Sequence, residues 1–158
     1  MIKIFADTSV ISEIIELSNN PLVSGFTTNP SLMKKAGVAD YESFCKEVLT
    51  ITSKPVSFEV FADDFDEMER QAKIISSWGE NVYVKIPIMN TEGKSSIVLI
   101  NKLLSEGIKI NITAVMKASQ LSGLGDTKTP HIISVFAGRI ADTGVDPCST
   151  IYDVKLRA

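Results

Sequence analysis

The stretch Asn81-Val-Tyr-Val-Lys-Ile-Pro87 alternates side chains with the period of two that is typical of a β-strand. Val82, Val84 and Ile86 share one apolar face, whereas Lys85 lies on the opposite face. Apolar side chains on one face of such a strand fit against helices. We therefore expect Lys85 to point into a barrel or a crevice.

Outward from this strand, short strand-like runs alternate with helical runs along the chain. The expected strands are rich in Val, Ile and Phe and cover residues 3–6, 23–27, 56–61, 81–86, 109–115 and 131–136. Apolar residues recur at helical spacing within 41–49, 65–75 and 97–104. This alternation predicts parallel strands joined by crossover helices, and hence an α/β fold.

Signals at the helix ends support two of these helices. Asp64 and Glu67 have capping-box spacing before the helix at 65–75, and Gly107 is a natural stop after the helix at 97–104. No linker or low-complexity tract interrupts the sequence. We expect one domain over residues 1–158.

Composition excludes several classes of protein. The chain has 158 residues, is 44% apolar, and carries a net charge of -3 without any basic run, which argues against nucleic-acid and membrane partners. No apolar run is long enough to span a membrane, and residues 1–10 do not resemble a secretory signal. Cys45 and Cys148 suit reduced thiols in a cytoplasmic protein, and the single histidine, His131, makes a His-based metal site a poor prediction.

Polar side chains gather toward the carboxyl ends of the expected strands. In parallel α/β folds this end carries the active site. The residues concerned, besides Lys85, are Asp7, Thr27, Asn29, Glu59, Asn111, Thr113 and Ser134. Burying several polar groups together costs free energy, so function explains such a cluster better than stability does. The alternatives are a snorkelling or edge position for Lys85 and core-capping ion pairs for the carboxylates.

Five segments of the chain resemble, in sequence and in order, the short transaldolases and the related fructose-6-phosphate aldolases, which are class I aldolases on a TIM barrel. They are Phe-Ala-Asp-Thr-Ser around Asp7, Gly25-Phe-Thr-Thr-Asn-Pro-Ser31, Val84-Lys-Ile-Pro87, Gly107-Ile-Lys-Ile-Asn-Ile-Thr-Ala114 and Ser134-Val-Phe-Ala-Gly-Arg-Ile140. Each segment alone is weak evidence, but the order and spacing of all five are specific.

The resemblance implies a role for each residue of the cluster. Lys85 forms the Schiff base, Asp7 acts as acid and base on the hydroxyl beside the broken bond, and Glu59 and Thr113 handle water and protons. The substrate-binding residues that it implies are Thr27, Asn29, Asn111, Ser134, Phe136 and Arg139. Among these, Arg139 would bind the phosphate. The alternative for Arg139 is a solvated surface charge. Glu59 and Phe136 resemble transaldolases, where the aldolases carry Gln and Tyr.

The chemistry of these side chains agrees with the implied roles. Only a neutral lysine attacks a carbonyl, and a partly desolvated amine loses its proton more readily. A carboxylate such as Asp7 can remove a hydroxyl proton and return it. An arginine fork matches phosphate oxygens. No cofactor or metal is expected, because the iminium itself withdraws electrons.

The sequence departs from the family in the number of its strands. A complete barrel has eight strands and about 250 residues, whereas this chain shows six strands and then a short segment at 149–157. We expect an incomplete TIM barrel of about six β/α units. Such a half-barrel would leave two strand edges and its apolar lining open. We expect copies of the chain to cover them in a homo-oligomer. The alternatives are completion by a separate polypeptide and a remnant that folds poorly.

The leading hypothesis is a transaldolase of the pentose phosphate pathway that acts on sugar phosphates. It would move a dihydroxyacetone unit from sedoheptulose 7-phosphate to glyceraldehyde 3-phosphate through Lys85, giving erythrose 4-phosphate and fructose 6-phosphate. One alternative is an aldolase that releases free dihydroxyacetone. Another is a catalytically inactive protein that binds sugar phosphates.

Overall fold

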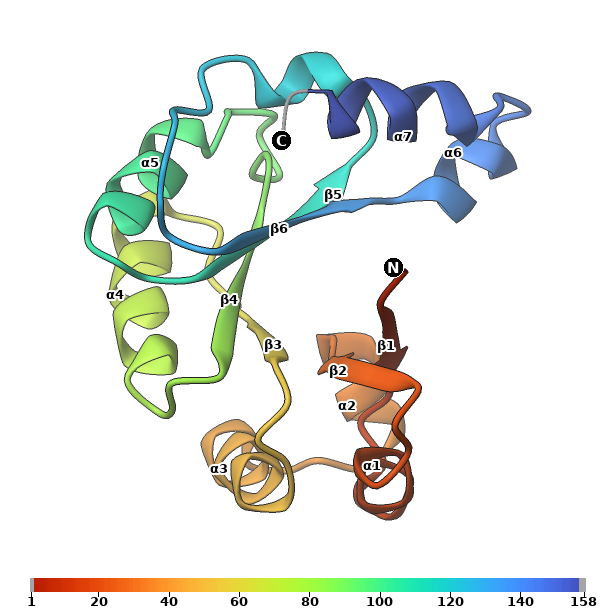
Figure 1. Ribbon diagram of the computed structural model, residues 1–158. Coiled ribbons are helices and arrows are strands. Elements are labelled where there is room, and N and C mark those ends of the chain that lie inside the picture. The colour runs from red at the N-terminus through yellow and green to blue at the C-terminus, as the bar shows by residue number, and fades with distance from the viewer. Residues whose placement is uncertain (1, 157–158) are drawn as a thin grey trace.

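The computed structural model describes residues 2–156 and shows one parallel sheet curled into an open half-barrel (Figure 1). Each strand pairs with the next strand along the chain. The strands are β1 (Ile4–Asp7), β2 (Val23–Thr27), β3 (Val56–Glu59), β4 (Val82–Pro87), β5 (Ile110–Val115) and β6 (His131–Val135). This arrangement confirms the predicted α/β fold and an incomplete TIM barrel.

Helices separate the strands and cover the convex side of the sheet. They are α1 (Ile11–Ser18), α2 (Pro30–Lys35), α3 (Tyr41–Ile51), α4 (Phe65–Ser76), α5 (Ile97–Ser105), the 3₁₀ turn η1 (Ala118–Leu121), α6 (Ala137–Asp142) and α7 (Pro147–Lys155). The three helices predicted from apolar spacing are α3, α4 and α5. Gly107 follows α5 with φ +83°, the left-handed conformation that favours glycine at a helix end.

Two local predictions need correction. Asp64 caps α4 through the backbone N–H groups of Asp66 and Glu67, but the Glu67 carboxylate binds Arg70 and Gln71 instead of reaching back to Asp64. The predicted capping box is therefore only half formed. The strand predicted at 56–61 ends at Glu59, because the backbone N–H of Phe61 turns away to the side chain of Gln71 on α4.

The outer face of the three central strands forms the core. Val84, Ile86 and Ile112 are fully buried, together with Ala72 of α4 and Leu103 of α5. The side chains of β4 alternate as the stretch at 81–87 predicts, with the apolar ones facing the helices and the polar ones on the opposite side of the sheet. We call the concave side of the sheet, opposite the helices, its inner face.

The two edge strands are less covered. Ile4 of β1 is 55% exposed, and every residue of β6 is only half-buried. α7 forms from the segment predicted at 149–157 and lines a pocket with His131, Ile133 and Val135 of β6.

Residues 1, 157 and 158 lie outside the described part of the chain, so the single domain over 1–158 stays a prediction. None of the helices within residues 2–156 combines the length and the apolar character that a membrane span requires.

Candidate active site

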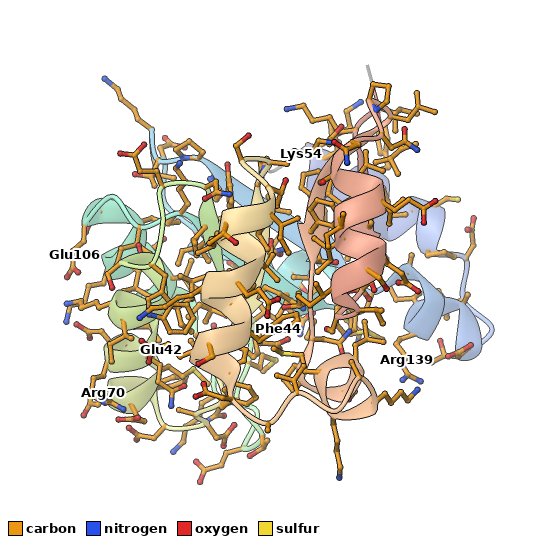
Figure 2. The ribbon with its side chains drawn as sticks, turned by 90° about the horizontal axis from the view of Figure 1, so that it is seen from below. Glu42, Phe44, Lys54, Arg70, Glu106 and Arg139 are labelled. Atoms are coloured by element: carbon orange, nitrogen blue, oxygen red, sulfur yellow. The ribbon has the colours of Figure 1, made fainter. Side chains whose placement is uncertain are left out.

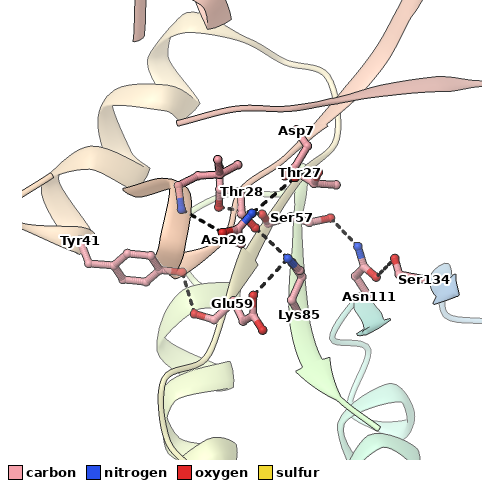
Figure 3. A network of polar contacts seen from close by, with 11 residues as sticks. Asp7, Thr27, Thr28, Asn29, Tyr41, Ser57, Glu59, Lys85, Asn111 and Ser134 are labelled. Atoms are coloured by element: carbon pink, nitrogen blue, oxygen red, sulfur yellow. Dashed lines mark hydrogen bonds and ion pairs between the residues drawn. The ribbon is translucent and has the colours of Figure 1, made fainter. Parts of the chain in front are cut away.

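Lys85 is buried on the inner face of β4. Only 8% of the residue is exposed, and its Nζ donates a 2.8 Å hydrogen bond to the backbone carbonyl of Thr28 (Figure 3). The same nitrogen lies 3.1 Å from Oε2 of Glu59. The amine is thus enclosed by protein acceptors and is not in bulk solvent.

The register of the sheet brings Glu59 to Lys85. These two residues are direct partners across β3 and β4, and Lys85 pairs in turn with Asn111 on β5. Paired residues of parallel strands project to the same face, so three polar side chains lie side by side on the inner face. The Glu59 side chain is 19% exposed, so water screens the ion pair only partly. A carboxylate at this distance can accept the proton that the ammonium must lose before the nitrogen attacks a carbonyl.

Asp7 ends β1, and two hydrogen bonds orient its carboxylate. Thr27 donates its hydroxyl to Oδ1 at 2.9 Å, and Asn29 donates its Nδ2 to Oδ2 at 3.4 Å. Asn29 also caps α2, because its Oδ1 accepts the backbone N–H of Leu32. The same side chain therefore begins a helix and positions the carboxylate of Asp7.

Asn111 lies at the centre of a second hydrogen-bonded chain. Its Nδ2 donates to Oγ of Ser57 at 3.1 Å, and its Oδ1 accepts the hydroxyl of Ser134 at 2.7 Å. The chain crosses the inner face from β3 to β6 (Figure 3). Among residues 2–156, the second N–H of the Asn111 amide and a further lone pair on its oxygen have no hydrogen-bond partner.

The structure does not bring every predicted site residue into these contacts. Thr113 is buried on β5, but within residues 2–156 no hydrogen bond joins its hydroxyl to the cluster. Ala114 follows it with φ +59°, a left-handed backbone that is strained for alanine and interrupts the pairing of β5 with β6.

Phe136 and Arg139 lie at the rim of the half-barrel. Phe136 is 39% exposed where α6 begins. The Arg139 side chain is 76% exposed, with its guanidinium 3.8 Å from the carboxylate of Asp142 (Figure 2). An exposed pair of this kind is weak, so the guanidinium could exchange Asp142 for a phosphate at little cost.

Sequence reasoning missed three residues that shape the site. Thr28 acts through its backbone carbonyl, which leaves no signal in the side-chain pattern. Ser57 could have been found, because it lies two residues before Glu59 on the same face of β3. Tyr41 comes from α3 and donates its hydroxyl to the backbone carbonyl of Glu59 at 2.7 Å, a contact that only the packing of α3 creates.

Comparison with known proteins finds a matching family model and similar relatives. The model of the family described as Transaldolase/Fructose-6-phosphate aldolase matches residues 4–154. A "Probable transaldolase 2" from Listeria monocytogenes is 40% identical over 154 residues, which are 97% of this chain and 67% of that protein. A "Probable transaldolase" from Methanococcus maripaludis is 40% identical over 152 residues, 96% of this chain and 68% of that protein. The chain thus spans about two thirds of the length of these relatives.

Proposed function

Because the chain belongs to the transaldolase/fructose-6-phosphate aldolase family, we propose that Lys85 forms a Schiff base with a ketose phosphate and passes a dihydroxyacetone unit to an aldose phosphate. The family supports an aldolase-type enzyme in general terms. The observation that carries the specific reaction is the buried contact between the Nζ of Lys85 and the carboxylate of Glu59.

Glu59 serves the first half of the reaction. Its carboxylate takes a proton from the ammonium of Lys85, and the neutral amine adds to the substrate carbonyl. The protonated Glu59 then returns the proton to the hydroxyl of the carbinolamine, which leaves as water. The product is an iminium on Lys85. Thr113, buried on the neighbouring strand, would assist with this water.

Asp7 serves the cleavage step. Its carboxylate removes the proton from the hydroxyl beside the bond that breaks, and the bonding electrons move into the iminium to give an enamine. An aldose phosphate departs, and the reverse of the cleavage joins the unit to the acceptor as a new iminium. Water then hydrolyses this iminium, which releases the new ketose phosphate and frees Lys85. Thr27 and Asn29 hold the carboxylate in place for this proton transfer.

The remaining polar groups bind the substrate. Asn111 and Ser134 lie on the inner face beside Lys85 and can contact the hydroxyls of the sugar chain. Arg139 binds the phosphate at the rim, with Phe136 beside it. We also propose a homo-oligomer, since Ile4 and the half-buried β6 leave apolar surface at both sheet edges. A cytoplasmic location is proposed because Cys45 and Cys148 are free thiols.

Trapping the covalent intermediate tests the proposal. Fructose 6-phosphate is added to the full chain, borohydride reduces any iminium, and peptide mass mapping locates the adduct. We expect a dihydroxyacetone adduct on the peptide that contains Lys85, and none in a Lys85→Met variant with the same circular dichroism spectrum. Folded wild-type protein without an adduct would contradict the proposal and favour a protein that only binds sugar phosphates.

A second assay distinguishes transfer from release. Erythrose 4-phosphate is added to the enzyme loaded with fructose 6-phosphate, and the products are separated. We expect sedoheptulose 7-phosphate to form faster than free dihydroxyacetone. The opposite ratio would identify an aldolase.

A further inference from the structure

The hydrogen-bond ladder between β2 and β3 stops one step before Glu59. The backbone N–H of Phe26 donates to the carbonyl of Pro55 at 2.8 Å, and that of Thr28 donates to the carbonyl of Ser57 at 3.2 Å. The next donor in this series would be residue 30, facing the carbonyl of Glu59. That residue is Pro30, which has no N–H and begins α2.

Tyr41 occupies the place of the missing donor. Its hydroxyl donates to the Glu59 carbonyl at 2.7 Å. Burial raises the pKa of Tyr41 above its usual value, so the hydroxyl keeps its proton and remains a donor.

Two further features hold Tyr41 in position. Asp40 caps α3 by accepting the backbone N–H of Ser43, and Tyr41 is the first residue of that helix. The tyrosine ring packs edge to face against Phe61 at 4.5 Å and against Trp78 at 5.9 Å between ring centroids. The donor is thus fixed by a helix end and an aromatic cluster on the outer side of the sheet.

We infer that Tyr41 is a positioning residue that holds the end of β3 so that the Glu59 carboxylate meets Lys85. The inference rests on the proposed Schiff-base function. Val60, the next residue, donates its backbone N–H to the carbonyl of Lys85 at 3.2 Å. Two hydrogen bonds therefore hold the backbone around Glu59, one to β4 through Val60 and one to α3 through the hydroxyl of Tyr41. Removal of the Tyr41 hydroxyl leaves the Glu59 carbonyl without this donor and allows the residue to turn.

The test compares Tyr41→Phe with a matched control, Tyr83→Phe. The control also removes one tyrosine hydroxyl, but from β4, the strand beside β3. Borohydride trapping with fructose 6-phosphate is followed over time at several substrate concentrations. We expect the maximal trapping rate of Tyr41→Phe to fall roughly tenfold, the effect of one lost hydrogen bond. The half-saturating concentration should stay within about twofold, because the substrate-binding groups are untouched. Tyr83→Phe should match the wild type.

A double variant links the effect to Glu59. If Tyr41 acts only by positioning this carboxylate, then Tyr41→Phe should add little to the loss already caused by Glu59→Gln. Additive losses would contradict the inference. Equal trapping rates in Tyr41→Phe and the wild type would also overturn it, as would a Tyr41→Phe chain that no longer melts cooperatively. Absence of an adduct in the wild type is a different result, since it removes the proposed function and the inference together.

Discussion

The centre and the edges of the sheet differ in how firmly they hold their polar residues. β3, β4 and β5 are buried along almost their whole length, and they carry Glu59, Lys85 and Asn111 as register partners. β1 and β6 are half-covered edge strands that carry Asp7 and Ser134. The centre therefore holds Lys85 and Glu59, the groups proposed to form the covalent bond, beside Asn111. The edges hold Asp7 and Ser134, which are proposed to act on the hydroxyls of the sugar.

The physical reason is the cost of placing an amine inside protein. A lysine that attacks a carbonyl needs a group within reach that accepts its proton, and the central strands place Glu59 beside the buried Lys85. The exposed groups proposed to act on a hydroxyl or to bind the phosphate, Asp7 and Arg139, lie on the edge strand β1 and on α6. Loss of Lys85 at the centre should thus abolish the covalent step, and loss of a buried side chain there should affect folding more than loss of an exposed side chain at an edge.

The largest expected effect is the loss of activity in Lys85→Met. Removal of the nucleophile should lower the transfer rate by at least a factor of about a thousand, equivalent to about 4 kcal/mol. Coupled-assay kinetics measure the rate. The matched control is Lys94→Met, since Lys94 is an exposed residue paired with Glu92 at 2.6 Å. Comparable losses in both variants would contradict a specific role for the buried amine of Lys85.

The second effect concerns folding. Phe58→Ala empties a fully buried position on β3 and should cost about 3–5 kcal/mol, whereas Ile4→Ala on β1 should cost less than about 1 kcal/mol because Ile4 is 55% exposed. Urea unfolding measures both. A large loss for Ile4→Ala would show that the β1 edge is covered in solution, as in the proposed oligomer. Size-exclusion chromatography would then show whether a second copy of the chain covers it.

A smaller effect is expected at the helix cap beside Asp7. Asn29→Ala removes the cap of α2 and one of the two donors to Asp7, and should cost about 1 kcal/mol. Asn29→Asp keeps the capping oxygen but replaces the donor to Asp7 with a like charge. We therefore expect Asn29→Asp to melt closer to the wild type than Asn29→Ala does while its trapping rate is low. Equal trapping rates in Asn29→Asp and the wild type would mean that the contact with Asp7 is dispensable.

The smallest effect is a dependence of stability on pH. Thr91 donates its hydroxyl and its backbone N–H to Asp63, at 2.6 and 2.8 Å, and these bonds lower the pKa of Asp63 below its usual value. A carboxyl whose pKa is lower in the folded state stabilises the fold above its unfolded pKa, and this contribution is lost as the pH falls through the folded pKa. Asp63→Asn should thus lower the melting temperature slightly at neutral pH, and the difference should shrink toward pH of about 2. Thr91→Val, which removes the hydroxyl that donates to Asp63, should reproduce part of this trend.

Much of the sheet could be predicted because it depends on local pattern. Alternation in the stretch at 81–87 is sufficient to assign β4 and to place Lys85 opposite the apolar residues, since strand geometry has a fixed period. Glu59 follows by the same argument from β3. The predicted strand at 56–61 was too long, because its end depends on Gln71 of α4, which captures the backbone of Phe61.

The sequence by itself determined the α/β alternation, the inner-face position of Lys85 and the family, because all three depend on residue types at short or ordered spacing. Only the tertiary structure decided that Lys85 contacts the carbonyl of Thr28, that Ser57 joins Asn111, and that Tyr41 replaces the donor missing at Pro30. These contacts join residues distant in sequence through backbone atoms and helix packing. No pattern within a single segment records them, since they arise only when the strands and helices are packed together.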